Sequence, residues 1–199
     1  MTRKYILTGG PGIEKNELLD ELYKKGVYVI REVASYIIGR ELKKEKGILP
    51  WTDREGFQKK VLETQIAWER EIPSDINVAF VDRGIPDGLA YYRIDGIQPP
   101  KELTEAVRNT CYAGVFILDP LKTYHNSEIR RENPEEALRI HQTLKEVYEE
   151  LGYEPVRILE ASLIHRAELI LNRIGFKRNA IGQPETSENA KRSLESLSK

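Results

Sequence analysis

The sequence predicts an α/β fold in which a parallel sheet of about five strands is flanked by helices. Three observations predict it. Short apolar runs alternate with segments of helical periodicity along residues 1–176. A glycine-rich turn follows the first apolar run. Polar residues follow several of the other apolar runs, as expected at the carboxyl ends of parallel strands, where ligands of such sheets bind.

The expected strands are short, mostly apolar runs, as buried strands of a parallel sheet should be. They lie at residues 5–8, 27–30, 78–81, 115–118 and 155–159. Because each is followed by a helical segment, the chain is expected to build βα units whose strands run parallel.

The expected helices carry apolar residues at intervals of three and four, and several end at a glycine. Asp53 or Thr52 is the expected N-cap of the third helix, and Pro134 suits the first turn of the sixth. Polar residues from 177 onward predict a mobile tail or a loosely docked helix, so we expect a domain at 1–176 and a polar tail at 177–199. The helices are expected at 15–25, 32–46, 53–72, 85–92, 99–109, 134–151 and 163–174.

The amino-acid composition indicates which binding partners and which cellular compartment to expect. The formal net charge is −1, which gives no reason to expect nucleic acid or an acidic membrane as a partner. Cys111 is the only cysteine, so no internal disulfide can form, which favours a reducing compartment such as the cytoplasm. It is interpreted as a small buried residue, with a catalytic thiol as the alternative. No run approaches the ~20 apolar residues that span a bilayer. Residues 1–4 lead directly into a strand, so no signal peptide is expected.

The turn after the first strand resembles a phosphate-binding loop. The pattern G-x-x-x-x-G-K-[ST] between a strand and a helix is nearly matched, with glycines, a proline and Lys15 in register. Glycines allow backbone N–H groups to surround a phosphate, while the helix N-terminus and the lysine add positive charge. The alternative is an ordinary glycine-rich turn. The residues expected to bind the phosphates are Gly9, Gly10, Pro11, Gly12, Ile13, Glu14, Lys15 and Asn16.

Two positions depart from the pattern. Glu14 stands where the second glycine belongs, and a carboxylate ~5 Å from a phosphate charge costs about 3 kcal/mol at an effective dielectric of 20. That penalty applies unless the side chain turns away to solvent. Asn16 stands where a Ser or Thr hydroxyl would hold Mg²⁺, and it offers only an amide oxygen. We therefore expect a phosphate pocket with weakened binding of a magnesium–nucleotide complex.

Polar residues at two other strand ends are candidates for the same site. Asp82 is expected to hold a metal or to accept a hydroxyl proton, and Arg83 to bind an anionic substrate. Glu32 follows the second strand and is a candidate to orient an acceptor or a metal-bound water. The alternative for all of them is a solvent-exposed strand end. Asp87 is interpreted as a helix cap or a member of a local salt bridge.

A charged segment at residues 121–133 is expected to form a loop before a helix. Arg130 and Arg131 within it predict a lid that closes over phosphates, with Arg130 as the catalytic clamp and Arg131 as a second, substrate-binding arginine. The alternative is a solvated charged loop. The three histidines lack the spacing of a zinc site.

Together these segments resemble the P-loop ATPases of the AAA-domain type, which include the nicotinamide riboside kinase-like domain of bacterial NAD regulators. The resemblance covers most of residues 4–175 and implies a P-loop kinase-like fold that uses ATP or GTP with Mg²⁺. The family's loop usually ends in Gly-Lys-Thr, which this chain replaces with Glu-Lys-Asn. The segments that carry the resemblance are Thr8–Gly12, Arg31–Ala34, Val81–Asp87, Tyr124–Glu132 and Arg139–Tyr153.

Two functions fit these residues. The first is a phosphotransferase or NTPase acting on a small molecule, in which Lys15 and Arg130 stabilise charge on the transferred phosphoryl group. Asp82 would then organise the metal or the acceptor. The second is a non-catalytic module that binds a nucleotide or another phosphorylated ligand and has lost hydrolysis. The acceptor, the base of the nucleotide and the oligomeric state stay open.

Overall fold

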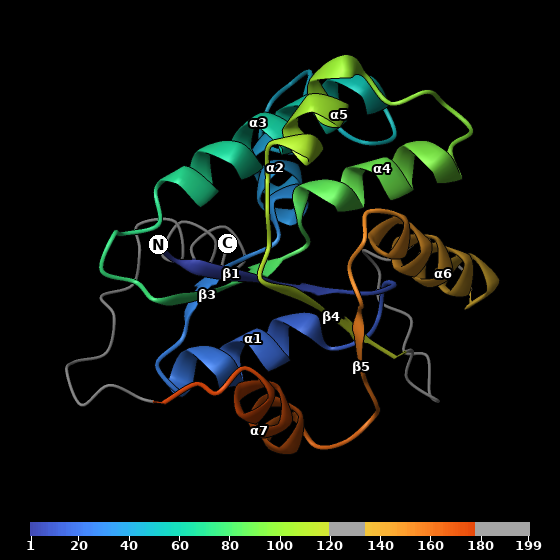
Figure 1. The fold of residues 1–199 in the computed structure, drawn as a ribbon. Helices are drawn as coiled ribbons and strands as arrows, with labels where there is room; N and C mark the ends of the chain where they lie inside the picture. Colours follow the sequence, from blue (N-terminus) through green and yellow to red (C-terminus); the bar gives the residue numbers. More distant parts are fainter. Residues whose placement is uncertain (120–133, 178–199) are drawn as a thin grey trace.

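The apolar runs pair into a parallel sheet (Figure 1) in the order β2-β3-β1-β4-β5. The structure is a computed structural model that describes residues 1–119 and 134–177. All five predicted strands are present, so the predicted fold class is confirmed. The strands are β1 (Arg3–Thr8), β2 (Tyr28–Ile30), β3 (Val78–Asp82), β4 (Gly114–Leu118) and β5 (Val156–Ile158).

Helices cover both faces of the sheet because successive side chains of each strand point to opposite faces. In β1, Leu7 packs into the core that α1 and α7 share, whereas Ile6 packs into the core on the side of α2 and α3. Figure 1 shows α1 and α7 together on one face and α2 to α5 on the other. The helices are α1 (Lys15–Lys24), α2 (Val33–Glu41), α3 (Arg54–Arg70), α4 (Ile85–Ile94), α5 (Lys101–Arg108), α6 (Pro134–Glu150) and α7 (Leu163–Arg173).

Two local expectations were wrong. The helix expected at 32–46 ends at Glu41, because the buried Glu41 carboxylate accepts the Ile48 N–H at 2.9 Å and so stabilises a turn after the helix. Cys111 is exposed rather than buried, and the next residue, Tyr112, takes the buried position. Within the described residues, no helix has both the length and the apolar character needed to cross a membrane.

Asp53 provides a direct test of the start of α3. Its carboxylate accepts the Gly56 N–H at 2.9 Å, as an N-cap does. Asp53→Ala should lower the free energy of unfolding by about 1 kcal/mol, whereas Asp53→Asn should keep most of it because asparagine caps equally well. Urea denaturation of the two variants measures the difference. No loss in Asp53→Ala would show that the cap contributes nothing, and an equal loss in both variants would show that the carboxylate charge, rather than side-chain capping, stabilises the helix.

Candidate functional site

The phosphate loop leaves the carboxyl end of β1 and turns directly into α1. Gly9 (φ 138°) and Gly12 (φ 82°) adopt backbone conformations that residues with a side chain rarely adopt. A Cβ on Gly9 would also lie 2.4 Å from Ile13 Cδ1 and 2.9 Å from the Leu118 carbonyl oxygen. The glycine is therefore needed for both the turn and the close approach to β4.

Lys15 is the first residue of α1 and points toward the end of β3. Its Nζ lies 3.9 Å from Asp82 Oδ1, and the two side chains are only 11% and 1% exposed. Asp82 Oδ1 has no hydrogen-bond donor among the described residues. The pair meets because β1 and β3 are neighbours in the sheet, with Leu7 opposite Asp82.

The electrostatics of this pair reflect its burial. Burial raises the pKa of Asp82 to about 6, although Lys15 opposes the shift. Burial lowers the pKa of Lys15, and the nearby Arg83 lowers it further. Both charges are thus poorly solvated. Mg²⁺ prefers oxygen ligands, and Asp82 Oδ1 is a buried carboxylate oxygen that accepts no hydrogen bond within the described residues. Asp82 is therefore suited to a magnesium site.

Asp82 should make the free energy of unfolding depend on pH. Because its folded pKa of about 6 exceeds the ordinary 3.8, the folded state holds the proton more tightly. Asp82 therefore stabilises the folded state fully below pH 3.8, and this contribution is lost as the pH rises through 6. The contribution is on the order of 3 kcal/mol at most. We expect Asp82→Asn, which is neutral throughout, to gain stability relative to wild type between pH 4 and 7. A constant difference in urea denaturation across that range would contradict the assigned burial effect.

Arg83 joins the loop to the end of β2. Its Nε donates to Glu32 Oε1 at 2.6 Å, and its Nη1 donates to the Gly9 carbonyl at 3.2 Å. Its backbone is left-handed (φ 63°), which is uncommon for a residue with a side chain. Burial opposes the charge of Glu32, but the cations Arg83 and Lys15 hold its pKa at about 2. The structure therefore brings Glu32 and Arg83 to the Lys15–Asp82 pair as charged groups.

Asp87 contributes more than the cap or local salt bridge expected from the sequence. It accepts the Gly84 N–H at 2.9 Å and pairs with Arg83 at 3.4 Å, as a cap and a local salt bridge would. It also accepts hydrogen bonds from the hydroxyls of Thr8, at 2.6 Å, and Tyr148. Asp87 is only 3% exposed. Thr8 and Tyr148 were missed because only the fold brings the end of β1 and α6 to this carboxylate.

The two departures from the loop pattern have different structural outcomes. Glu14 has a left-handed backbone (φ 54°), and its carboxylate forms an ion pair with Arg166 of α7. The repulsion expected from the sequence requires a Glu14 carboxylate that faces the phosphate, whereas in the structure Arg166 holds this carboxylate in an ion pair. Asn16 is exposed, and its backbone carbonyl accepts Arg31 Nη1 at 3.1 Å.

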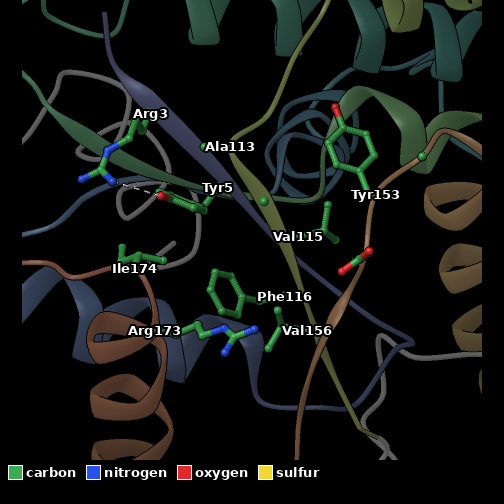
Figure 2. Close-up of a pocket in the computed structure, with 12 residues that line it drawn as sticks. Arg3, Tyr5, Ala113, Val115, Phe116, Tyr153, Val156, Arg173 and Ile174 are labelled. Carbon is green, nitrogen blue, oxygen red and sulfur yellow. Dashed lines mark hydrogen bonds between the residues drawn. The ribbon is translucent and has the colours of Figure 1, made fainter.

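Arg130 and Arg131, the expected lid arginines, are outside the described residues. A pocket of about 500 Å³ lies near the starts of β1, β4 and β5, between Arg3, Tyr5 and Tyr153 (Figure 2). That is the opposite end of the strands from the phosphate loop, and ligands of parallel sheets bind at carboxyl ends. Across the described ranges, no group of three or more His, Cys, Asp or Glu residues is placed to hold a metal.

The parallel sheet and the glycine-rich loop between β1 and α1 have the arrangement of the P-loop kinase-like fold expected from the sequence. The family model described as "AAA domain" matches residues 4–166, so the chain belongs to the AAA domain family. No curated protein matches the sequence.

Solved structures share this fold at low sequence identity. NadR in complex with NR has a TM-score of 0.65 at 13% identity over 91% of this chain, which spans about half (53%) of the NadR chain. Deoxyadenosine kinase from M. mycoides with bound dATP has a TM-score of 0.56 at 16% identity and covers 87% of this chain and 100% of its own. Thymidylate kinase from Candida albicans has a TM-score of 0.59 at 11% identity, over 87% and 91%.

Proposed function

We propose that this protein binds ATP or GTP with Mg²⁺ at residues 9–16 and transfers a phosphoryl group to a small-molecule acceptor. The observation that carries the proposal is the buried Lys15–Asp82 pair, 3.9 Å apart, where the positive-φ loop enters α1. An anionic phosphate at this helix N-terminus would add a counter-ion to Lys15 besides Asp82, where burial lowers the pKa of the lysine. Solved neighbours bound to dATP and to AMP-PNP support a nucleotide as the ligand.

Each charged group has a role in this proposal. Lys15 binds the phosphates and stabilises charge on the transferred group, with Arg130 as a second cation from the lid. Asp82 and Asn16 hold Mg²⁺, which when bound neutralises phosphate charge. Arg83 and Glu32, joined at 2.6 Å, bind the acceptor, with Arg131 as a further substrate-binding group.

A second candidate is a module that binds a nucleotide without transferring phosphate. The observation that favours it is Asn16, an exposed residue without the hydroxyl that would hold Mg²⁺. Positioning and electrostatics supply nearly all the catalysis in phosphoryl transfer, so a misplaced metal would reduce turnover more than affinity.

Asn16→Thr separates the two functions. We expect wild type to bind MgATP or MgGTP in calorimetry and to transfer phosphate slowly to one member of a panel of nucleosides, nucleotides and hydroxy acids. The threonine should raise turnover by roughly tenfold, at the low end of the 10- to 100-fold effects typical of groups that support a metal site. Binding without transfer in both forms would favour the module. No binding of either nucleotide in either form would overturn the proposal.

Three broader expectations stay predictions. They are the boundary between a domain at 1–176 and a tail at 177–199, a cytoplasmic location, and the lack of a nucleic-acid partner. Limited proteolysis tests the first of them, because an unpacked tail is cleaved before the domain.

A further inference from the structure

Arg166, in the first turn of α7, is a buried cation whose anionic partner lies in the phosphate loop. Its side chain is 2% exposed, whereas that of its partner, Glu14, is 43% exposed. The ion pair joins Arg166 Nη2 to Glu14 Oε2 across 152 residues of sequence. Arg166 Nε is buried without a hydrogen-bond partner among the described residues. Glu14 is therefore the ion-pair partner of this buried guanidinium.

Because Glu14 lies in the phosphate loop, the direction in which its carboxylate points decides whether it repels a bound phosphate. It directly precedes Lys15 and caps α1 with a left-handed backbone, where the loop pattern has a glycine. A glycine there brings no side chain, but a glutamate brings a negative charge within a few ångströms of the expected phosphate. The ion pair with Arg166 directs that charge toward α7.

We propose that Arg166 is a positioning residue of the phosphate loop, which holds the Glu14 carboxylate on α7 and so keeps it away from the bound phosphate. This inference rests on the proposed function, because it concerns phosphate binding at residues 9–16. In this account Glu14 is tolerated in place of glycine because α7 carries a buried arginine that neutralises it.

The exposures of the two partners dictate which variants are informative. Arg166→Met replaces the buried cation with an apolar chain of similar length and leaves Glu14, which water reaches, so the fold should survive. Glu14→Gly alone leaves Arg166 buried without its anion, which is unfavourable. The informative comparison is therefore Arg166→Met with and without Glu14→Gly in the same chain. Arg173→Met, at the exposed end of α7, is the matched control.

The experiment measures the affinity of each variant for MgADP by calorimetry at low salt and at 0.5 M NaCl. Arg166→Met should weaken binding by roughly tenfold to a hundredfold at low salt, because the released carboxylate repels the phosphates. High salt should reduce that loss. Arg166→Met with Glu14→Gly should bind within about threefold of wild type, since the repelling group is gone. Arg166→Lys should retain most of the affinity, and Arg173→Met all of it.

The outcomes distinguish this inference from the function on which it rests. If wild type binds MgADP and Arg166→Met binds it equally well, the positioning role is wrong and the nucleotide function stands. A loss that neither salt nor Glu14→Gly reverses would show a merely structural role for Arg166 and also overturn the inference. Wild type that binds neither ADP nor ATP would overturn both proposals together.

Discussion

Lys15→Met is expected to weaken MgATP binding by about 10²- to 10³-fold and to abolish any phosphoryl transfer. A unit charge 4 Å from a phosphate is worth about 4 kcal/mol at an effective dielectric of 20, and each 1.4 kcal/mol is tenfold in affinity. The Lys15 side chain is only 11% exposed, so water cannot replace the lost cation well. Calorimetry for affinity and a phosphate-release assay for turnover measure the two effects.

Lys24→Met is the matched control, because Lys24 lies at the other end of the same helix and its side chain is 67% exposed. It should change neither affinity nor turnover. Circular dichroism should show both variants folded. If Lys15→Met bound MgATP as tightly as Lys24→Met did, the nucleotide phosphates would not lie at the loop.

Asp87→Ala should lower the free energy of unfolding by about 3–5 kcal/mol, among the largest effects of a single substitution in a small domain. The carboxylate accepts hydrogen bonds from Thr8, Gly84 and Tyr148 and pairs with Arg83. Removing it leaves several buried donors without an acceptor, each at a cost of about 1–3 kcal/mol before relaxation. Urea denaturation of the unliganded protein measures this without any assumption about function.

Two further variants make the Asp87 result specific. Tyr148→Phe removes one donor and leaves the carboxylate satisfied by the others, so it should cost only about 1 kcal/mol. Asp75→Ala, at an exposed turn, should stay within about 0.5 kcal/mol of wild type. Asp87→Ala as mild as Asp75→Ala would show that the buried network contributes little.

The features that were predictable from the sequence are those that local patterns encode. Each strand is a short apolar run, and the loop at residues 9–16 is continuous in sequence, so its position between a strand and a helix could be read directly. Asp82 could be placed near Lys15 because parallel strands end at one edge of the sheet. In the structure Lys15 Nζ lies 3.9 Å from Asp82 Oδ1.

The remaining features depend on contacts between distant segments. Tyr148 reads as an ordinary member of an apolar helix face, and only the packing of α6 reveals its hydrogen bond to Asp87, 61 residues away. Arg166 lies in the expected final helix with nothing in the sequence to mark it, yet it is buried and pairs with Glu14. No periodicity encodes either pairing. The same dependence explains why the repulsion expected of Glu14 could not take its pairing with Arg166 into account.

The most direct test of the account is the effect of MgADP on the backbone amide signals of the ¹⁵N-labelled protein. The account predicts that amides of residues 9–16 and of Asp82 and Arg83 shift most, because the phosphates bind the N–H groups of the loop. Shifts confined to residues around the opposite pocket, such as Arg3 and Tyr153, or no shifts at all, would contradict it.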